Sequence, residues 1–241
     1  GSPVSDQAKG LLITLFGVLF VVPDSLFVRV IEADALTIAC LRVTLVGALI
    51  GAVVLLREGV TPFRAFAATG LPGLLYMIGL GSSGVLFVMA VSLTSVANVV
   101  FIIASLPVFA MIFSRIFLAE RISPRMFFTI AAVLPGLAVI AYGSGETEGA
   151  SLAGDLLAVC VSALFAGALT AARYVRGTSM VPGVALGYLL GGLAILPWAA
   201  PLAVEASQYP VVALHVGTIA ISAVLLALGP RYITSAEVGL L

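Results

Sequence analysis

Charged side chains are scarce in this sequence. Lys and Arg together number 11, Asp and Glu also number 11, and the four types make up 9% of the 241 residues, against about 25% in a soluble domain. The formal net charge is zero, which removes the basic field that a nucleic-acid partner requires. Apolar residues make up 62%, with a mean hydropathy of +1.26. No water-soluble fold can bury so many apolar side chains, so the sequence predicts a membrane protein whose surface is covered by lipid.

Several catalytic and nucleotide-binding patterns are also missing. The only lysine is Lys9, and no G-x-x-x-x-G-K-[ST] motif occurs, so no ATPase machinery or ATPase subunit is expected. The two cysteines, Cys40 and Cys160, lie inside apolar runs, and His215 is the only histidine. These residues form no metal-ligand spacing and no nucleophile–base set. The sequence therefore predicts no metal site, no cofactor and no enzyme activity.

Long apolar runs fill almost the whole chain. A membrane-spanning helix needs about 20 mostly apolar residues, whereas the strands of a barrel alternate in segments of about ten. The runs here are uniform and long, which predicts an all-α membrane protein. The expected spans are residues 10–30, 36–56, 66–92, 95–118, 125–142, 152–174, 181–204 and 210–230, with a ninth from about 233.

Basic residues gather on one side of these predicted spans. If the helices alternate in direction, nine of the eleven Lys and Arg fall on the same side: Lys9, Arg57, Arg64, Arg115, Arg121, Arg125, Arg173, Arg176 and Arg231. The positive-inside rule then predicts a cytoplasmic N-terminus.

Short sequence matches suggest an internal repeat. The segment 93–99 aligns without gaps to 232–238 at an offset of 139 residues, and Leu11-Leu12 and Leu19-Phe20 match Leu156-Leu157 and Leu164-Phe165 at an offset of 145. This offset equals five helices, and an odd number of spans forces the second copy to enter from the opposite side. We therefore predict two inverted repeats, residues 1–142 with helices 1–5 and residues 151–241 with helices 6–9, joined by the polar loop 143–150. By this symmetry the complete protein has about 40 further residues and ten helices.

Several motifs carry a resemblance to a known family: Thr94-Ser95-Val96-Ala97-Asn98, Leu106-Pro107, Leu118-Ala119-Glu120-Arg121-Ile122-Ser123, Gly136 and the block from Arg231 to Leu241. They resemble the EamA repeat of the drug/metabolite transporter superfamily, and the nearest likeness is to the YddG-type branch of bacterial amino-acid exporters. The resemblance implies a multi-pass protein of the bacterial inner membrane. It also implies a central cavity lined by helices 1, 3, 4, 6, 8 and 9.

Ionisable residues inside spans are costly and are therefore candidates for function. Asp24 and Arg42 lie at similar predicted depth in the first two spans, either as a gate or substrate dock or as a buried ion pair. Asn98 and Glu237 occupy equivalent repeat positions near opposite faces, as substrate contacts or as interhelical hydrogen bonds. His215 is either a residue that couples transport to proton movement or a structural residue.

Apolar helices contribute further candidates. Pro107 falls in the middle of the fourth span, where proline permits a kink or hinge. The small-residue run 79–84 allows either tight helix packing or a thin wall beside a cavity. Tyr76, one turn earlier, and Phe165, in the sixth span, offer aromatic surfaces to a substrate, although core packing explains Phe165 equally.

Taken with the resemblance, these features predict a secondary transporter that exports small metabolites by alternating access. The expected partners are a small-molecule substrate and the lipid bilayer. Aromatic and other neutral amino acids suit the scarcity of charge, and the lack of a defensible ion site favours a facilitator. The alternatives are a proton-coupled drug or metabolite transporter of the same superfamily and a non-transporting membrane scaffold. A channel would need a continuous polar stripe, which the sequence lacks.

Overall fold

The structure is a computed structural model that describes residues 27–28, 30–103, 105–120, 124–144 and 151–228. Over these residues the protein is all-helical, without strands, as the apolar runs predicted. Six described stretches are long and apolar enough to cross a membrane: Ala35–Glu58, Leu71–Leu93, Ala97–Leu118, Leu152–Tyr174, Val181–Trp198 and Ala206–Leu228.

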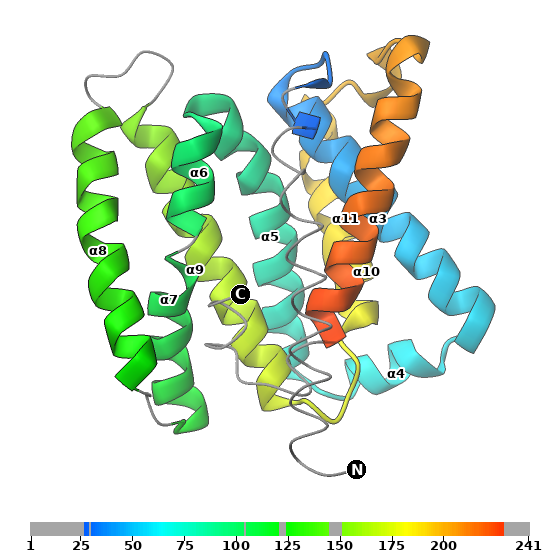
Figure 1. Ribbon diagram of the computed structural model, residues 1–241. Coiled ribbons are helices and arrows are strands. Elements are labelled where there is room, and N and C mark those ends of the chain that lie inside the picture. The colour runs from blue at the N-terminus through cyan, green and yellow to red at the C-terminus, as the bar shows by residue number, and fades with distance from the viewer. Residues whose placement is uncertain (1–26, 29, 104, 121–123, 145–150, 229–241) are drawn as a thin grey trace.

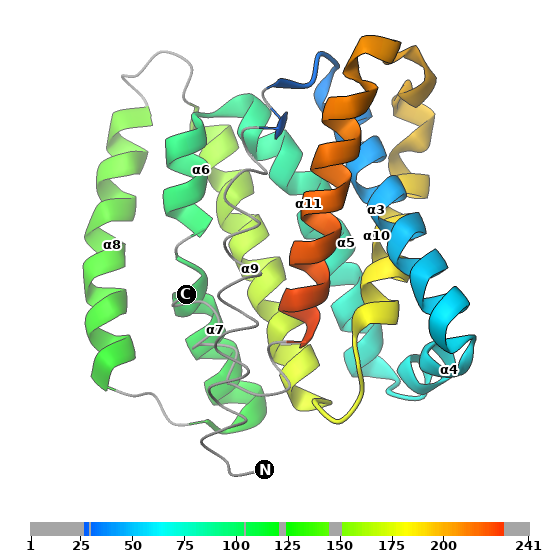
Figure 2. The same cartoon turned by 45° about the vertical axis from the view of Figure 1, so that its right-hand side comes forward.

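The elements follow one another in this order: α3 (Ala35–Glu58), α4 (Thr61–Ala67), α5 (Leu71–Leu93), α6 (Val96–Ile103), α7 (Leu106–Phe113), a π-helical turn η1 (Ser114–Leu118), α8 (Pro124–Ser144), α9 (Leu152–Tyr174), α10 (Val181–Ile195), three 3₁₀ turns and α11 (Tyr209–Leu228). Helix α8 lies at one edge of the bundle, and α3 and α4 lie at the opposite edge (Figures 1 and 2). Helix α9 packs along α5 and also against α6 and α7, while α10 packs along α3 and α5. Helix α11 packs on α3.

Glycines allow the central helices to approach closely. A Cβ added at Gly47 would lie 2.8 Å from the Ala185 carbonyl oxygen, and one added at Gly187 would lie 2.7 Å from the Met77 carbonyl oxygen. On α5, a Cβ at Gly79 would lie 2.9 Å from the Leu164 carbonyl oxygen of α9, and one at Gly81 would collide with Gly187. Small residues thus join α3, α5, α9 and α10 into one tightly packed unit.

Three predicted spans differ from the observed elements. The span expected at 66–92 starts at Leu71, because the separate helix α4 ends at Ala67, Gly70 at φ 71° precedes α5 and Pro72 occupies its first turn. The span expected at 181–204 leaves the α-helix at Ile195, since Pro197 and Pro201 each start a 3₁₀ turn. The single helix expected at 95–118 is interrupted.

This interruption lies between α6, which ends at Ile103, and α7, which begins at Leu106 with Pro107 in its first turn. Proline has no N–H to continue the helical ladder, which explains why α7 starts as a new helix. The Ser162 hydroxyl of α9 donates to the Ile102 carbonyl oxygen over 3.1 Å, beside the break. The fourth predicted span is therefore a discontinuous helix anchored to α9.

Candidate functional site

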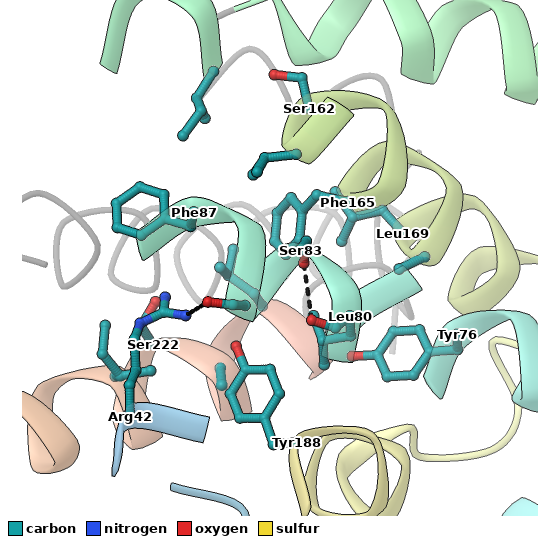
Figure 3. Close-up of a pocket in the computed structure, with 17 residues that line it drawn as sticks. Arg42, Tyr76, Leu80, Ser83, Phe87, Ser162, Phe165, Leu169, Tyr188 and Ser222 are labelled. Atoms are coloured by element: carbon teal, nitrogen blue, oxygen red, sulfur yellow. Dashed lines mark hydrogen bonds between the residues drawn. The ribbon is translucent and has the colours of Figure 1, made fainter. Parts of the chain in front are cut away.

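A cavity of about 90 Å³ lies among the central helices (Figure 3). Its walls come from five helices and from one residue of α6. The lining consists of Arg42, Tyr76, Leu80, Ser83, Gly84, Phe87, Ile103, Val161, Ser162, Phe165, Ala168, Leu169, Tyr188, Ile219, Ser222, Ala223 and Leu226. These residues come from both sides of the loop 145–150, so the cavity lies between the two halves of the sequence.

The cavity lies about halfway along α5 and α9, the two helices that contribute most of its lining. On α5 the lining runs from Tyr76 to Phe87, within a helix of residues 71–93. On α9 it runs from Val161 to Leu169, within a helix of residues 152–174. In a membrane this depth corresponds to the middle of the bilayer, which is where secondary transporters place their substrate sites.

Arg42 is the one cation in the described lining, and it is 6% exposed. Its Nη1 donates to the Gly84 carbonyl oxygen of α5 over 2.6 Å. Its guanidinium carbon lies 5.1 Å from the ring centroid of Phe87, a cation–π contact. These two contacts hold the charge beside the cavity and offset part of the cost of removing it from water.

Hydroxyl groups supply most of the remaining polarity. In Figure 3 the hydroxyls of Tyr76 and Tyr188 both point toward the middle of the cavity. The Ser83 hydroxyl donates to the Leu80 carbonyl oxygen over 2.9 Å, and Ser222 adds a further hydroxyl to the wall. The described lining contains no carboxylate. Such a site suits a small molecule with an apolar or aromatic body and a few hydrogen-bonding groups.

Three of the predicted site residues meet at this cavity. Arg42, Tyr76 and Phe165 all belong to its lining. In Figure 3 the Phe165 ring faces the cavity beside Leu169, both from α9. Pro107 starts the helix that follows Ile103, a lining residue. Asp24 and Glu237 lie outside the described residues.

Asn98 lies instead in a polar cluster where α5, α6 and α9 meet. The Thr94 hydroxyl donates to Asp155 Oδ1 over 2.9 Å, and Asn98 Nδ2 lies 3.4 Å from Thr94 Oγ1 and 3.5 Å from Asp155 Oδ1. Ser151 caps α9 by accepting from the Gly154 N–H over 3.1 Å, and its hydroxyl donates to the Leu93 carbonyl oxygen over 2.6 Å. The cluster therefore ties the start of α9 to the α5–α6 junction.

His215 is 1% exposed on α11 and stacks on Phe27. The two ring centroids lie 5.4 Å apart at an interplanar angle of 25°. This contact joins α11 to the chain that precedes α3, and His215 is not part of the cavity lining.

The sequence did not indicate Tyr188, Ser162 or Ser222 as site residues, whereas Ser83 belongs to the run 79–84 that was a candidate cavity wall. Single hydroxyl residues in apolar helices give no local signal, because many such residues face packed neighbours. One comparison within the chain does point to Ser222. When Pro72 is aligned with Pro210 and Gly79 with Gly217, Gly84 aligns with Ser222 at the same offset.

The membrane-length spans define a polytopic membrane protein, and a cavity lies among its central helices. The model of the EamA-like transporter family matches residues 8–142, more than half of the chain. The chain therefore belongs to the EamA-like transporter family, whose members are membrane transporters of small metabolites.

A solved structure described as "Crystal structure of protein" has a similar fold. It is 21% identical to this chain and superposes with a TM-score of 0.71, covering 97% of this chain and 83% of that one. At this identity the likeness concerns the fold alone. Among curated proteins no match was found.

Proposed function

We propose that the protein is a secondary transporter that moves small metabolites across the bacterial inner membrane by alternating access. The observation that carries this proposal is the central cavity, walled by both halves of a chain of the EamA-like family. If the halves 1–142 and 151–241 are inverted repeats, exchanging their conformations opens the cavity to opposite sides in turn. The N-terminus is then cytoplasmic, because the arginine-rich ends of the spans face inward.

The lining favours neutral amino acids, above all aromatic ones, as in the YddG-type branch. Phe165 and Phe87 offer aromatic faces, and the cavity's apolar walls suit an uncharged side chain. The Arg42 guanidinium suits a carboxylate, and the inward hydroxyls of Tyr76 and Tyr188 suit an ammonium group. The described lining holds no carboxylate to carry a proton, which favours facilitated export down a gradient.

The other predicted residues take roles around this cavity. Arg42 and Pro107 serve as gate and hinge, since one binds α3 to α5 and the other begins the helix after the break. Asn98, whose amide lies within 3.5 Å of Thr94 and Asp155 at the α5–α6 junction, serves as a gate or substrate contact near one end of the spans. His215 is the candidate for coupling substrate transport to proton movement. Asp24 and Glu237 are further candidates for contact with the substrate.

Uptake into proteoliposomes tests the proposal. The full-length protein is reconstituted and assayed with labelled phenylalanine, tryptophan, leucine and glutamate, with and without an imposed pH gradient. We expect saturable uptake of the neutral amino acids, little uptake of glutamate, and no dependence on the gradient. Empty liposomes and liposomes with heat-denatured protein are the controls.

Other results separate the alternatives. If uptake requires the pH gradient, the protein is a proton-coupled transporter rather than a facilitator. His215 is then the first residue to test. If no amino acid is taken up, the substrate assignment is wrong, and a wider metabolite panel then decides whether the protein transports at all.

A further inference from the structure

A second and larger hollow, of about 760 Å³, lies on the outside of the bundle. Its walls are the first turns of α5, the end of α7 with η1, and the second half of α9. The lining consists of Leu71, Pro72, Leu75, Ile78, Gly79, Phe113, Ile116, Phe117, Ala163, Leu164, Gly167, Ala168, Thr170, Ala171 and Tyr174. We call it the outer groove. It shares only Ala168 with the central cavity, because the two hollows use different faces of α5 and α9.

The outer groove is apolar and open. Leu71, Ile116 and Phe117 are about two-thirds exposed. Thr170 lies in the groove wall, and its hydroxyl donates a hydrogen bond to the Ala166 carbonyl oxygen over 2.8 Å. Since these residues belong to membrane spans, hydrocarbon rather than water covers them.

The length of the outer groove matches one leaflet of the bilayer. Along α9 its lining extends from Ala163 to Tyr174, a rise of about 16 Å at about 1.5 Å per residue. Half of a hydrocarbon core of about 30 Å is about 15 Å. One acyl chain of a phospholipid therefore fits the groove lengthwise, with its polar end at Tyr174.

Positive charge surrounds that polar end. Helix α5 starts at Leu71, η1 ends at Leu118 and α9 ends at Tyr174, and all three ends lie at the same lower end of the bundle in Figure 1. Arg115 of η1 and Arg176, two residues after α9, are both exposed there. The neighbouring Glu120 carboxylate is paired with Arg173 over 3.5 Å, and the net charge of Arg115, Arg173, Arg176 and Glu120 together is positive.

From this combination we propose that the outer groove is a binding site for an anionic phospholipid of the adjacent leaflet. One acyl chain lies between α5, η1 and α9, and the phosphate is held at the rim by Arg115 and Arg176. Basic rims between membrane helices favour anionic headgroups in the same way. This site is separate from the central cavity and does not depend on the transport proposal.

Native mass spectrometry of the full-length protein, with phosphatidylglycerol or phosphatidylcholine added in mild detergent, tests the site. The first variant is Gly167→Leu, because a Cβ at Gly167 meets only Phe113 Cε2, at 3.8 Å, so the new side chain enters the groove without collision. We expect the amount of phosphatidylglycerol that this variant retains to fall about tenfold. This is the loss of affinity expected when about two CH₂ groups of the lipid lose their apolar contact. Gly217→Leu on α11, where a Cβ meets nothing within 4 Å, is the matched control and should retain lipid as the wild type does.

A charge variant tests the headgroup separately. Arg115→Gln should remove most of the preference for phosphatidylglycerol over phosphatidylcholine, whereas Arg57→Gln, an exposed arginine at the end of α3, should not. Equal lipid retention by the wild type and Gly167→Leu would overturn the proposal, as would a wild type without headgroup preference. If the wild type binds no lipid and Gly167→Leu lowers the melting temperature in lipid-free detergent, protein occupies the groove and the proposal is wrong.

Discussion

Arg42 shows how a charged side chain is tolerated halfway along these apolar helices. Its guanidinium is fixed by the Gly84 carbonyl oxygen at 2.6 Å and by the Phe87 ring, both on α5. An ionised group at this depth is costly unless such contacts compensate it. The same contacts place the charge at the edge of the central cavity, so one residue both links two helices and sets the cavity's electrostatic character.

The Thr94–Asp155 pair is a buried polar link outside the cavity. Asp155 is 4% exposed and accepts the Thr94 hydroxyl at 2.9 Å. Replacing Thr94 with Val leaves a buried carboxylate short of a donor, which should lower the free energy of unfolding by about 1–3 kcal/mol. The measurement is unfolding in mixed detergent micelles, with Thr94→Ser as the control that keeps the hydroxyl.

A double-mutant cycle with Asp155→Asn makes this prediction specific. Residues that share a hydrogen bond should show a coupling energy of about 1 kcal/mol. If the effects of the two substitutions simply add, the hydrogen bond does not contribute to stability and our description of the cluster is wrong.

Gly81 provides a packing prediction at the same scale. A Cβ there would collide with the backbone of Gly187, so Gly81→Ala must push α5 away from α10. Overpacking of this kind costs about 1–3 kcal/mol, and we expect a clearly lower melting temperature in detergent. Gly217→Ala, where nothing lies within 4 Å, should leave the melting temperature unchanged. Equal melting temperatures for the two variants would contradict the close packing of α5 on α10.

At the scale of elements, the break between α6 and α7 lies beside the cavity. Ile103 lines the cavity at the end of α6, and Ser162 of α9, also a lining residue, donates to the Ile102 carbonyl oxygen. Discontinuous helices beside a mid-membrane site are typical of transporters in which two rigid parts move against each other.

Pro107→Ala tests whether the break acts as a hinge. Restoring the N–H lets α6 and α7 approach one continuous helix, so we expect the maximal rate of transport to fall by roughly threefold, with KM changed less than about twofold. Pro135→Ala, inside the exposed helix α8, is the matched control and should leave the rate unchanged. Equal rates for the two variants would exclude a hinge at Pro107.

The sequence predicted long elements well and their interruptions less well. The spans predicted at 36–56, 152–174 and 210–230 agree with α3, α9 and α11 to within two residues, because a continuous apolar run fixes the length of a membrane helix. Helix α4 was missed, since its seven residues are too few for a hydrophobic period to emerge. The early end of α10 depends on Pro197 and Pro201, and membrane helices tolerate proline too often for either to predict a stop.

The candidate site was predictable only in part, for a related reason. Arg42 stood out because a charge in a span is rare, and Tyr76 because it precedes the glycine-rich run. The same run proved to serve both suggested purposes, with Gly79 and Gly81 in helix packing and Ser83 and Gly84 in the cavity wall. Asp155 was visible only as an acidic residue at a helix end, because its contact with Thr94 joins residues 61 positions apart.

At the scale of the whole molecule, the arrangement brings the two halves of the chain together along their length. Helix α3 packs along α10, and these are the second predicted spans of the first and second halves. Helix α9, from the second half, packs along α5, from the first. The central cavity lies between these pairs, so a change in how the halves pack also changes the access to the cavity.

The most direct test of the account is whether the central cavity carries the substrate. Ala223 of α11 lines the cavity, so Ala223→Leu fills part of it, whereas Gly217→Leu adds the same side chain to α11 in open space. Proteoliposomes containing either variant are compared with the wild type in uptake of the best substrate from the amino-acid panel. If the central cavity binds the substrate, uptake is lost in Ala223→Leu and kept in Gly217→Leu, with equal melting temperatures for both. Uptake at the wild-type rate by a correctly folded Ala223→Leu protein would contradict it.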